Sequence, residues 1–276
     1  MTALLPMDIH SHSENSPDAD YLVLKMCEAA MEKRIALFAI TDHYDIYLHI
    51  NDYSALDATL DKAIREISAA RDLYRGKLRI LAGIELGQPL ENQAKAEEVL
   101  KSHPFDFVLG SLHNPPGSPD FYLYDPADEG YELEKELENY FIRLLATVRW
   151  GGFDSAAHLS LPFRYILRHH PDYLFGKWDD YLESIVKALA EQGLALEVNT
   201  SGVLNRPSYT MPEGRWVKRF KELGGEKLTL GADAHSPQRV GAGILEGMAI
   251  AAEAGFAYLC YFLKRQPHYI KLEEYR

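Results

Sequence analysis

Hydrophobic positions along the chain form short apolar runs that alternate with longer amphipathic stretches. The short runs are typical of buried strands and cover residues 7–9, 36–40, 78–84, 107–109, 152–157, 194–198 and 228–230, with 257–263 as a further candidate. The longer stretches have helical periodicity and cover residues 20–34, 54–75, 93–102, 133–150, 179–192, 212–223 and 241–254. Strands that alternate with helices predict βαβ crossovers and a parallel sheet.

The length of the chain narrows this to an α/β fold built as a barrel. With 276 residues, of which 47% are hydrophobic, one large domain can bury a substantial core. A closed or nearly closed barrel suits this length, and we expect residues 1–276 to form a single domain. The alternative is a doubly wound open sheet, which is disfavoured because no glycine-rich phosphate loop follows the first strand. Residues 114–130, rich in Pro, Gly and Asp, predict a surface loop or lid beside the site.

Polar residues able to bind metals follow nearly every predicted strand. In chain order they are His10 and His12, Asp42 and His43, Glu85, His113, His158, Asn199 with Thr200 and Ser201, and finally Asp233 and His235. In a parallel barrel all carboxyl ends of strands point to one face, so these side chains are expected to meet there. Six of the eleven histidines hold such positions.

Imidazole and carboxylate groups in this number predict a site for two or three metal ions. They suit Zn, Mn or Fe, and a carboxylate such as Glu85 can bridge two ions. Ions of this kind polarise a phosphoryl oxygen and lower the pKa of water to roughly 7. A single histidine after a strand is more often a hydrogen-bonded loop residue, and Asp18 could simply cap a helix. The shared position at strand ends favours the metal site over these separate interpretations.

Composition and charge exclude several classes of function. The net charge of −12 and the pI near 5.4 argue against long nucleic acids as partners. No apolar run approaches the length of a membrane span, and the first residues lack the pattern of a secretory signal. Cys27 and Cys260 lie in apolar surroundings, as expected of buried thiols in a cytoplasmic protein. The oligomeric state is not indicated by the sequence.

Several motifs together resemble the polymerase and histidinol phosphatase (PHP) family, and most closely its histidinol-phosphate phosphatases. The motifs, in the family's order, are DIHSHSENSPD, AITDHYD, AGIELG, HPFDFVLGSLHN, AAHLSLPFRY, LEVNTSG and LGADAHSPQRVG. They extend from about Asp8 to Phe262, nearly the whole chain. One departure is Ser160, which stands where close relatives often have an acid that could contact a cationic substrate amine.

The resemblance implies a distorted (β/α)7 barrel with a trinuclear site of Zn, Mn or Fe. It implies three ligand sets: His10, His12, Glu85 and Asp233 for one ion; Glu85, His113 and His158 for the second; Asp18, His43 and His235 for the third. Arg206 resembles the family's phosphate-binding arginine, and Arg164 and Ser201 are further candidates for substrate binding. A metal-supported histidine such as His43, or Asp42, is the candidate to protonate the leaving group.

The expected activity is hydrolysis of a small phosphate monoester, with L-histidinol phosphate as substrate in histidine biosynthesis. Another PHP phosphoesterase, acting on nucleotides or other small phosphate esters, is the alternative within the class. A metal-retaining barrel without turnover is a rival from a different class, and the intact ligand set argues against it. Amide or ester hydrolysis on an amidohydrolase-like barrel is a third possibility. It is disfavoured because the residues gathered at the ends of the first seven predicted strands include no lysine.

Overall fold

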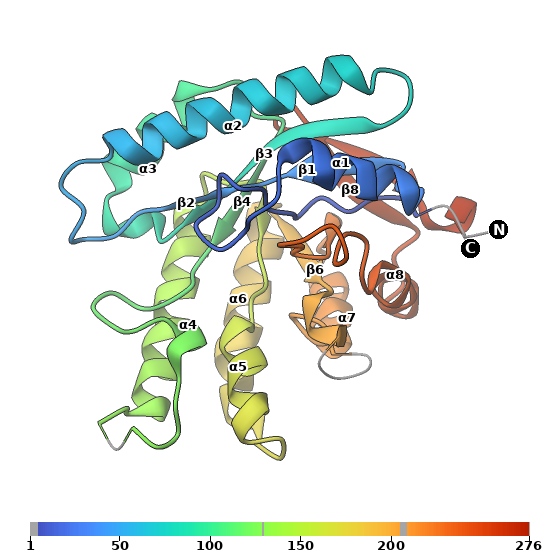
Figure 1. Cartoon of the computed structure of the whole chain (residues 1–276). Coiled ribbons are helices and arrows are strands. Elements are labelled where there is room, and N and C mark those ends of the chain that lie inside the picture. Colours follow the sequence, from blue (N-terminus) through green and yellow to red (C-terminus); the bar gives the residue numbers. More distant parts are fainter. Residues whose placement is uncertain (1–4, 129, 205–208, 276) are drawn as a thin grey trace.

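The described residues, 5–128, 130–204 and 209–275, form in the computed structural model a curled parallel sheet with helices packed around it (Figure 1). The strands of the sheet are β1 (Leu37–Ile40), β2 (His43–Asp45), β3 (Arg79–Gly87), β4 (Phe107–Ser111), β5 (Ser155–Ala156), β6 (Ala195–Asn199) and β7 (Leu228–Gly231). They pair in the order β1-β3-β4-β5-β6-β7, and β2 also pairs with β3. Every pairing within this sheet is parallel, which confirms the predicted α/β architecture.

The N-terminal segment joins the two ends of this sheet. The N–H of Asp8 donates to the carbonyl of Leu37 on β1 at 2.9 Å, and the N–H of Ile9 donates to that of Leu230 on β7 at 3.0 Å. Further along, the N–H of His12 donates to the carbonyl of Ala234 at 2.9 Å. The segment makes isolated bridges to both neighbours and is not a regular strand, so the barrel is distorted where its ends meet.

The helices follow the strands in the predicted alternation. They are α1 (Val23–Glu32), α2 (Ser54–Leu73), α3 (Gln93–Ser102), α4 (Leu133–Trp150), α5 (Leu161–His169), α6 (Asp179–Gln192), α7 (Gly214–Glu222) and α8 (Ile244–Glu253), with short 3-10 turns η1 (Pro89–Glu91), η2 (Phe121–Leu123), η3 (Phe175–Trp178), η4 (Ser201–Leu204) and η5 (Leu272–Tyr275). Seven of them correspond to predicted helices. The eighth, α5, was not predicted as a helix; it begins with Pro162 in its first turn and buries Phe163 and Ile166.

The candidate strand at 257–263 lies outside the barrel. It forms β8 (Tyr258–Leu263), which pairs antiparallel with β9 (Gln266–Lys271) in a separate two-stranded sheet. The turn between them uses Lys264 and Arg265 at φ of 49° and 61°, the left-handed backbone that tight hairpins require. This hairpin was not predicted, since neither turn residue is Gly, Asn or Asp.

A continuous apolar core fills the space between the sheet and its helices. The central strand β4 is buried along its whole length, as expected of a parallel strand covered on both faces. Within the described ranges, no helix is long and apolar enough to cross a membrane.

Candidate metal centre

A cavity of about 480 Å³ opens where the parallel strands end at their carboxyl side. Among the side chains that line it are seven of the predicted metal ligands: Asp18, His43, Glu85, His113, His158, Asp233 and His235. His10 and His12, the remaining two, lie fully buried against this group. All nine predicted ligands therefore come together, although they span more than two hundred positions in the sequence.

The carboxylate of Glu85 lies among five imidazoles. Its Oε1 is 2.8 Å from Nε2 of His158 and 3.2 Å from Nε2 of His113. Its Oε2 is 3.1 Å from Nδ1 of His43, 3.2 Å from Nε2 of His10 and 3.5 Å from Nε2 of His12. Burial alone raises the pKa of Glu85, but these imidazoles outweigh burial and hold it well below its ordinary value. Glu85 is therefore ionised and faces several lone-pair donors at once, as a bridging ligand must.

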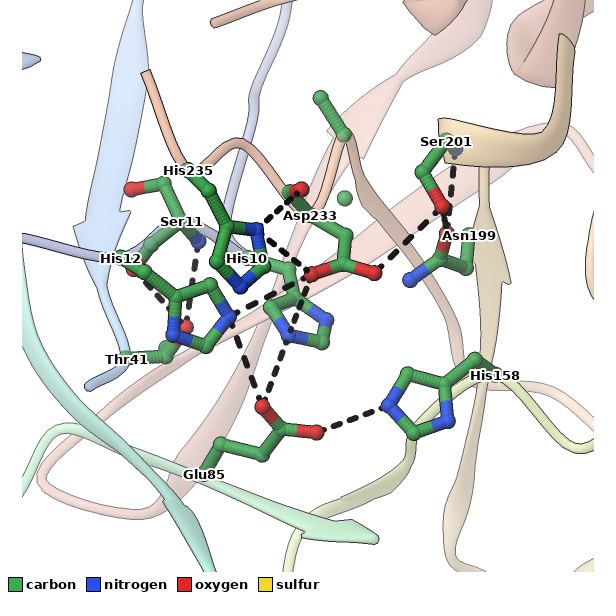
Figure 2. A network of polar contacts seen from close by, with 12 residues as sticks. His10, Ser11, His12, Thr41, Glu85, His158, Asn199, Ser201, Asp233 and His235 are labelled. Atoms are coloured by element: carbon green, nitrogen blue, oxygen red, sulfur yellow. Dashed lines mark hydrogen bonds and ion pairs between the residues drawn. The ribbon is translucent and has the colours of Figure 1, made fainter. Parts of the chain in front are cut away.

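Asp233 forms a second centre next to Glu85 (Figure 2). Its Oδ1 lies 3.4 Å from Nε2 of His12, 3.6 Å from Nδ1 of His235 and 3.7 Å from Nε2 of His10. Burial raises the pKa of Asp233, and the facing imidazoles outweigh it, so the pKa is well below the ordinary value.

Asp18 closes the cluster on its outer side. Its carboxylate lies 3.0 Å from Nε2 of His235 and 3.6 Å from Nε2 of His43. Burial raises the pKa of the Asp18 carboxyl. The two histidines lower this pKa by a larger amount, so it lies below its ordinary value. Because α1 begins only at Val23, Asp18 is not the residue that caps this helix.

The donor atoms are arranged as metal ligands are. Three groups of ligand atoms each lie within 4.8 Å of one another: His12, His43 and His235; His10, His12 and Glu85; His43, Glu85 and His113. Buried Nε2 of His12 and Nδ1 of His43 make no hydrogen bond within the described part of the chain. Orphaned imidazole nitrogens beside carboxylates fit divalent metal ions of the Zn, Mn and Fe type.

His10 and His113 are each oriented by a hydrogen bond from the ring nitrogen that does not face Glu85. Nδ1 of His10 donates to Oε1 of Glu197 at 2.7 Å, and Nδ1 of His113 donates to Oδ1 of Asp45 at 3.1 Å. Such a bond fixes the tautomer and points the other ring nitrogen at the metal position. Glu197 and Asp45 were not among the predicted site residues, because the sequence does not show which side chain an acid within a strand will contact.

Two of the ligands have unusual backbone conformations. His158 and Asp233 have φ of 27° and 52°, which residues other than glycine and asparagine rarely adopt. Such strain concentrates at functional sites, where the surrounding structure holds it. Oε2 of Glu197 helps to hold the backbone of His158 in this conformation, because it accepts the N–H of His158 at 2.8 Å.

Asp42 lies outside the cavity, contrary to the candidate role as a proton donor. Its carboxylate accepts the N–H and the hydroxyl of Ser13 at 2.6 and 2.7 Å and the hydroxyl of Ser16 at 2.9 Å. Burial raises its pKa, while these bonds lower it in part. With both oxygens occupied, Asp42 holds the loop that carries His12.

Two of the predicted substrate-binding residues, Arg164 and Ser201, lie among the described residues. Nη1 of Arg164 donates to Oγ of Ser201 at 2.8 Å and to Oδ2 of Asp233 at 3.2 Å, and Nη2 donates to the hydroxyl of Tyr165 at 2.7 Å. Arg164 thus lies at the edge of the metal ligands. Arg206 lies outside the described residues.

Ser160, where relatives often carry an acid, is not placed to meet a substrate. It is only 2% exposed, precedes α5, and does not line the cavity.

Comparisons with known proteins agree with this arrangement. The family model described as "PHP domain" matches residues 8–201. The "Histidinol-phosphatase" of Lactococcus lactis is 29% identical over 259 residues, which are 93% of this chain and 94% of that protein. The "Probable histidinol-phosphatase" of Clostridium acetobutylicum is 27% identical over 95% of this chain and 98% of its own length.

Solved structures give the same result. The crystal structure of histidinol phosphate phosphatase from Lactococcus lactis, complexed with Zn, L-histidinol and phosphate, superposes with a TM-score of 0.82 at 27% identity and covers 96% of this chain and 100% of that one. The structure of the putative histidinol phosphatase from Listeria monocytogenes shares the fold, with a TM-score of 0.70 at 18% identity over 86% of this chain and 98% of that one. The barrel, the cluster at its strand ends and the family match together lead to one conclusion: this chain belongs to the PHP domain family.

Proposed function

We propose that the chain, as a single PHP barrel domain, hydrolyses L-histidinol phosphate to L-histidinol and phosphate with the help of two or three divalent metal ions. The observation that carries this is the Glu85 carboxylate among five imidazoles, with the guanidinium of Arg164 bonded to the neighbouring Asp233. A metal cluster beside a fixed cation is the arrangement that a phosphate dianion requires. The similarity to histidinol phosphatases over most of the chain supports the substrate.

The proposed ligand sets follow the family pattern. His10, His12, Glu85 and Asp233 hold one ion; Glu85, His113 and His158 hold the second; Asp18, His43 and His235 hold the third. The proximity groups support this division, since each shares two or three members with one of the sets. The donors suit Zn, Mn or Fe. When bound, these ions polarise the phosphoryl group and make water acidic enough to supply hydroxide near neutral pH.

Arg164 is proposed to bind the phosphate. Its guanidinium is held by Tyr165, Ser201 and Asp233, so little side-chain entropy remains to be lost when an anion binds. Nε of Arg164 is buried and makes no hydrogen bond to any described residue. Arg164 itself lines the cavity. Arg206 is proposed as a second phosphate ligand on the strength of the family motif alone.

The leaving alkoxide needs a proton, and we propose that His43 supplies it from the ring nitrogen that does not bind an ion. A bound ion displaces the proton of the coordinated nitrogen only, so the opposite N–H of the imidazole stays available. His43 also lines the cavity. In this proposal Asp42 positions the loop and does not touch the substrate.

Phosphate release from four compounds tests the activity: L-histidinol phosphate, AMP, a phosphodiester and p-nitrophenyl phosphate. We expect L-histidinol phosphate to have the highest kcat/KM and metal-depleted protein to be inactive. Glu85→Ala and His235→Ala should lower kcat by about 100-fold or more. His268→Ala is the matched control, since this histidine is exposed on β9 and should leave turnover unchanged. Faster hydrolysis of the diester, or full activity of both site variants, would contradict the proposal.

A further inference from the structure

One carboxylate in the cavity has no positively charged partner. Asp18, Asp45, Glu85 and Asp233 each lie within ion-pair distance of an imidazole, and Asp233 also pairs with Arg164. Asp120 lines the same cavity, and no ion pair joins it to any residue in the described ranges. An ionised acid in a cavity next to a metal centre attracts a cation from outside the protein.

The position of Asp120 is fixed by its own backbone. It precedes η2 in the loop that follows β4, and its Oδ1 accepts the N–H of Tyr122 at 2.8 Å. Oδ2 makes no hydrogen bond to a described residue and remains able to accept one. Tyr47 lines the cavity as well. Burial raises the pKa of the Tyr47 phenol, and the negative charges of Asp45 and Asp120 raise it further.

Positive charge gathers on the side of Asp233. A second cavity of about 180 Å³ is lined by Arg164, Arg168 and Arg239, together with Asp233, and does not include Asp120. The guanidinium groups of Arg164 and Arg168 both lie 4.9 Å from the ring centroid of Tyr165. Arg164 and Arg168 also line the larger cavity together with Asp120. The substrate site therefore contains guanidinium groups beside Asp233 and, in the same cavity, a carboxylate that forms no ion pair with a described residue.

We propose that Asp120 is the specificity-determining residue that binds the positively charged nitrogen of the substrate, with Tyr47 beside it. This rests on the proposed function, since L-histidinol phosphate combines a phosphate dianion with an ammonium group and an imidazole. The phosphate lies towards Arg164 and the metal ligands, and the charged nitrogen lies against Oδ2 of Asp120. The phenol ring of Tyr47 adds an electron-rich face for a cation.

This assignment explains how the chain dispenses with an acid at position 160. Ser160 is buried before α5 and does not itself line the cavity. Asp120 supplies the missing negative charge from a different loop.

Inhibition by L-histidinol tests the subsite without using hydrolysis of the natural ester. With the metal-loaded enzyme and p-nitrophenyl phosphate as substrate, we expect Asp120→Asn to raise the Ki of L-histidinol by about 10- to 100-fold, the loss of one charge-assisted hydrogen bond. The Ki of inorganic phosphate should change far less than the Ki of L-histidinol, and Asp120→Glu should restore part of the affinity for L-histidinol.

Asp125→Asn is the matched control. Asp125 lies in the same loop and its carboxylate accepts the N–H of Ala127 at 2.9 Å, the same local bond that Asp120 makes, but it is exposed and does not line the cavity. It should leave the Ki of L-histidinol unchanged. Equal Ki values for wild type and Asp120→Asn, or an equal effect of Asp125→Asn, would overturn the inference.

Two further inhibitors identify the nitrogen. Phosphoethanolamine carries only the ammonium group, and 3-(imidazol-4-yl)propyl phosphate carries only the imidazole. The compound whose binding weakens in Asp120→Asn contains the group that Asp120 binds, and no change for either compound argues against the subsite. If the wild type hydrolyses p-nitrophenyl phosphate but not L-histidinol phosphate, the proposed function fails, while the Ki of L-histidinol still decides on Asp120.

Discussion

Glu197 accepts a hydrogen bond from Nδ1 of His10 at 2.7 Å, and both side chains are buried. The opposite nitrogen of His10, Nε2, lies 3.2 Å from Glu85 and 3.7 Å from Asp233. Glu197 therefore sets which nitrogen of His10 faces the metal ligands, from a strand that contributes no ligand of its own.

We expect Glu197→Gln to weaken metal binding about 10- to 100-fold, because an amide neither fixes the His10 tautomer nor increases its basicity. Metal content after dialysis against a graded series of chelator concentrations measures the change. Glu183→Gln, which removes a half-buried acid on α6 that pairs with Arg219, is the control and should retain the wild-type content. If Glu197→Gln retained all of its metal, metal binding would not depend on the hydrogen bond between Glu197 and His10.

Metal binding should depend on pH because protons occupy the same imidazoles. Burial lowers the pKa values of His10, His43 and His113, but the facing carboxylates outweigh it and raise all three well above 6.5. In metal-free protein near pH 7 these rings are protonated, and an ion has to displace the protons. We expect the affinity for Zn to rise between about pH 6 and pH 8 and proton release per ion to fall as the pH increases.

Calorimetric titration of metal-free protein with Zn in buffers of different ionisation enthalpy measures this proton release. A pH-independent affinity, or binding without release of protons, would mean that the imidazoles are neutral before the metal arrives.

Gly231, at the end of β7, has no room for a side chain. A Cβ there would lie 2.3 Å from Cβ of His10 and 2.7 Å from Oε1 of Glu197. Gly231→Ala should therefore destabilise the fold by about 1–3 kcal/mol and displace His10, with loss of bound metal. Thermal unfolding and metal analysis measure both effects. Gly176→Ala is the control, since a Cβ at Gly176 meets nothing within 4 Å, and a similar loss of stability in both variants would count against this explanation.

The two cysteines should be inert in the folded protein. Burial raises the pKa of the Cys27 thiol to about 12, and burial likewise raises that of Cys260 to about 12. Because a raised thiol pKa favours the neutral form, only about one molecule in ten thousand carries a thiolate at about pH 8. Iodoacetamide should leave both residues unmodified in native protein and alkylate both in denaturant, as read by mass spectrometry. Fast modification of native protein would show that these segments open.

The ligand histidines could be found from the sequence because each lies within five residues after the end of an apolar run. No side-chain contact had to be known to place His10, His113 and His158 in one site. Parallel strands bring their carboxyl ends together whatever the details of packing. The fold was predicted for the same reason, through the regular alternation of strand and helix.

Other parts depend on partners that the sequence does not display. Glu197 reads as one polar position within a buried strand, and only the structure shows that it faces His10. Asp42 sits next to His43 in the chain, but successive residues of an extended segment point to opposite sides, so it turns away from the cavity towards Ser13. The β9 strand escaped detection because its side chains are mostly exposed and give no apolar run.

The N-terminal segment, lying between β1 and β7, has a consequence for biosynthesis. His10 and His12 leave the ribosome long before their partners do. The carbonyl of Ala234, which accepts the N–H of His12, and the carboxylate of Asp233, which lies at ion-pair distance from His12, emerge more than two hundred residues later. A nascent chain therefore cannot assemble the complete cluster until the segment that carries Asp233 and His235 has been made. Cotranslational capture of ions would have to begin at incomplete sets of ligands, and full occupancy would require this later segment.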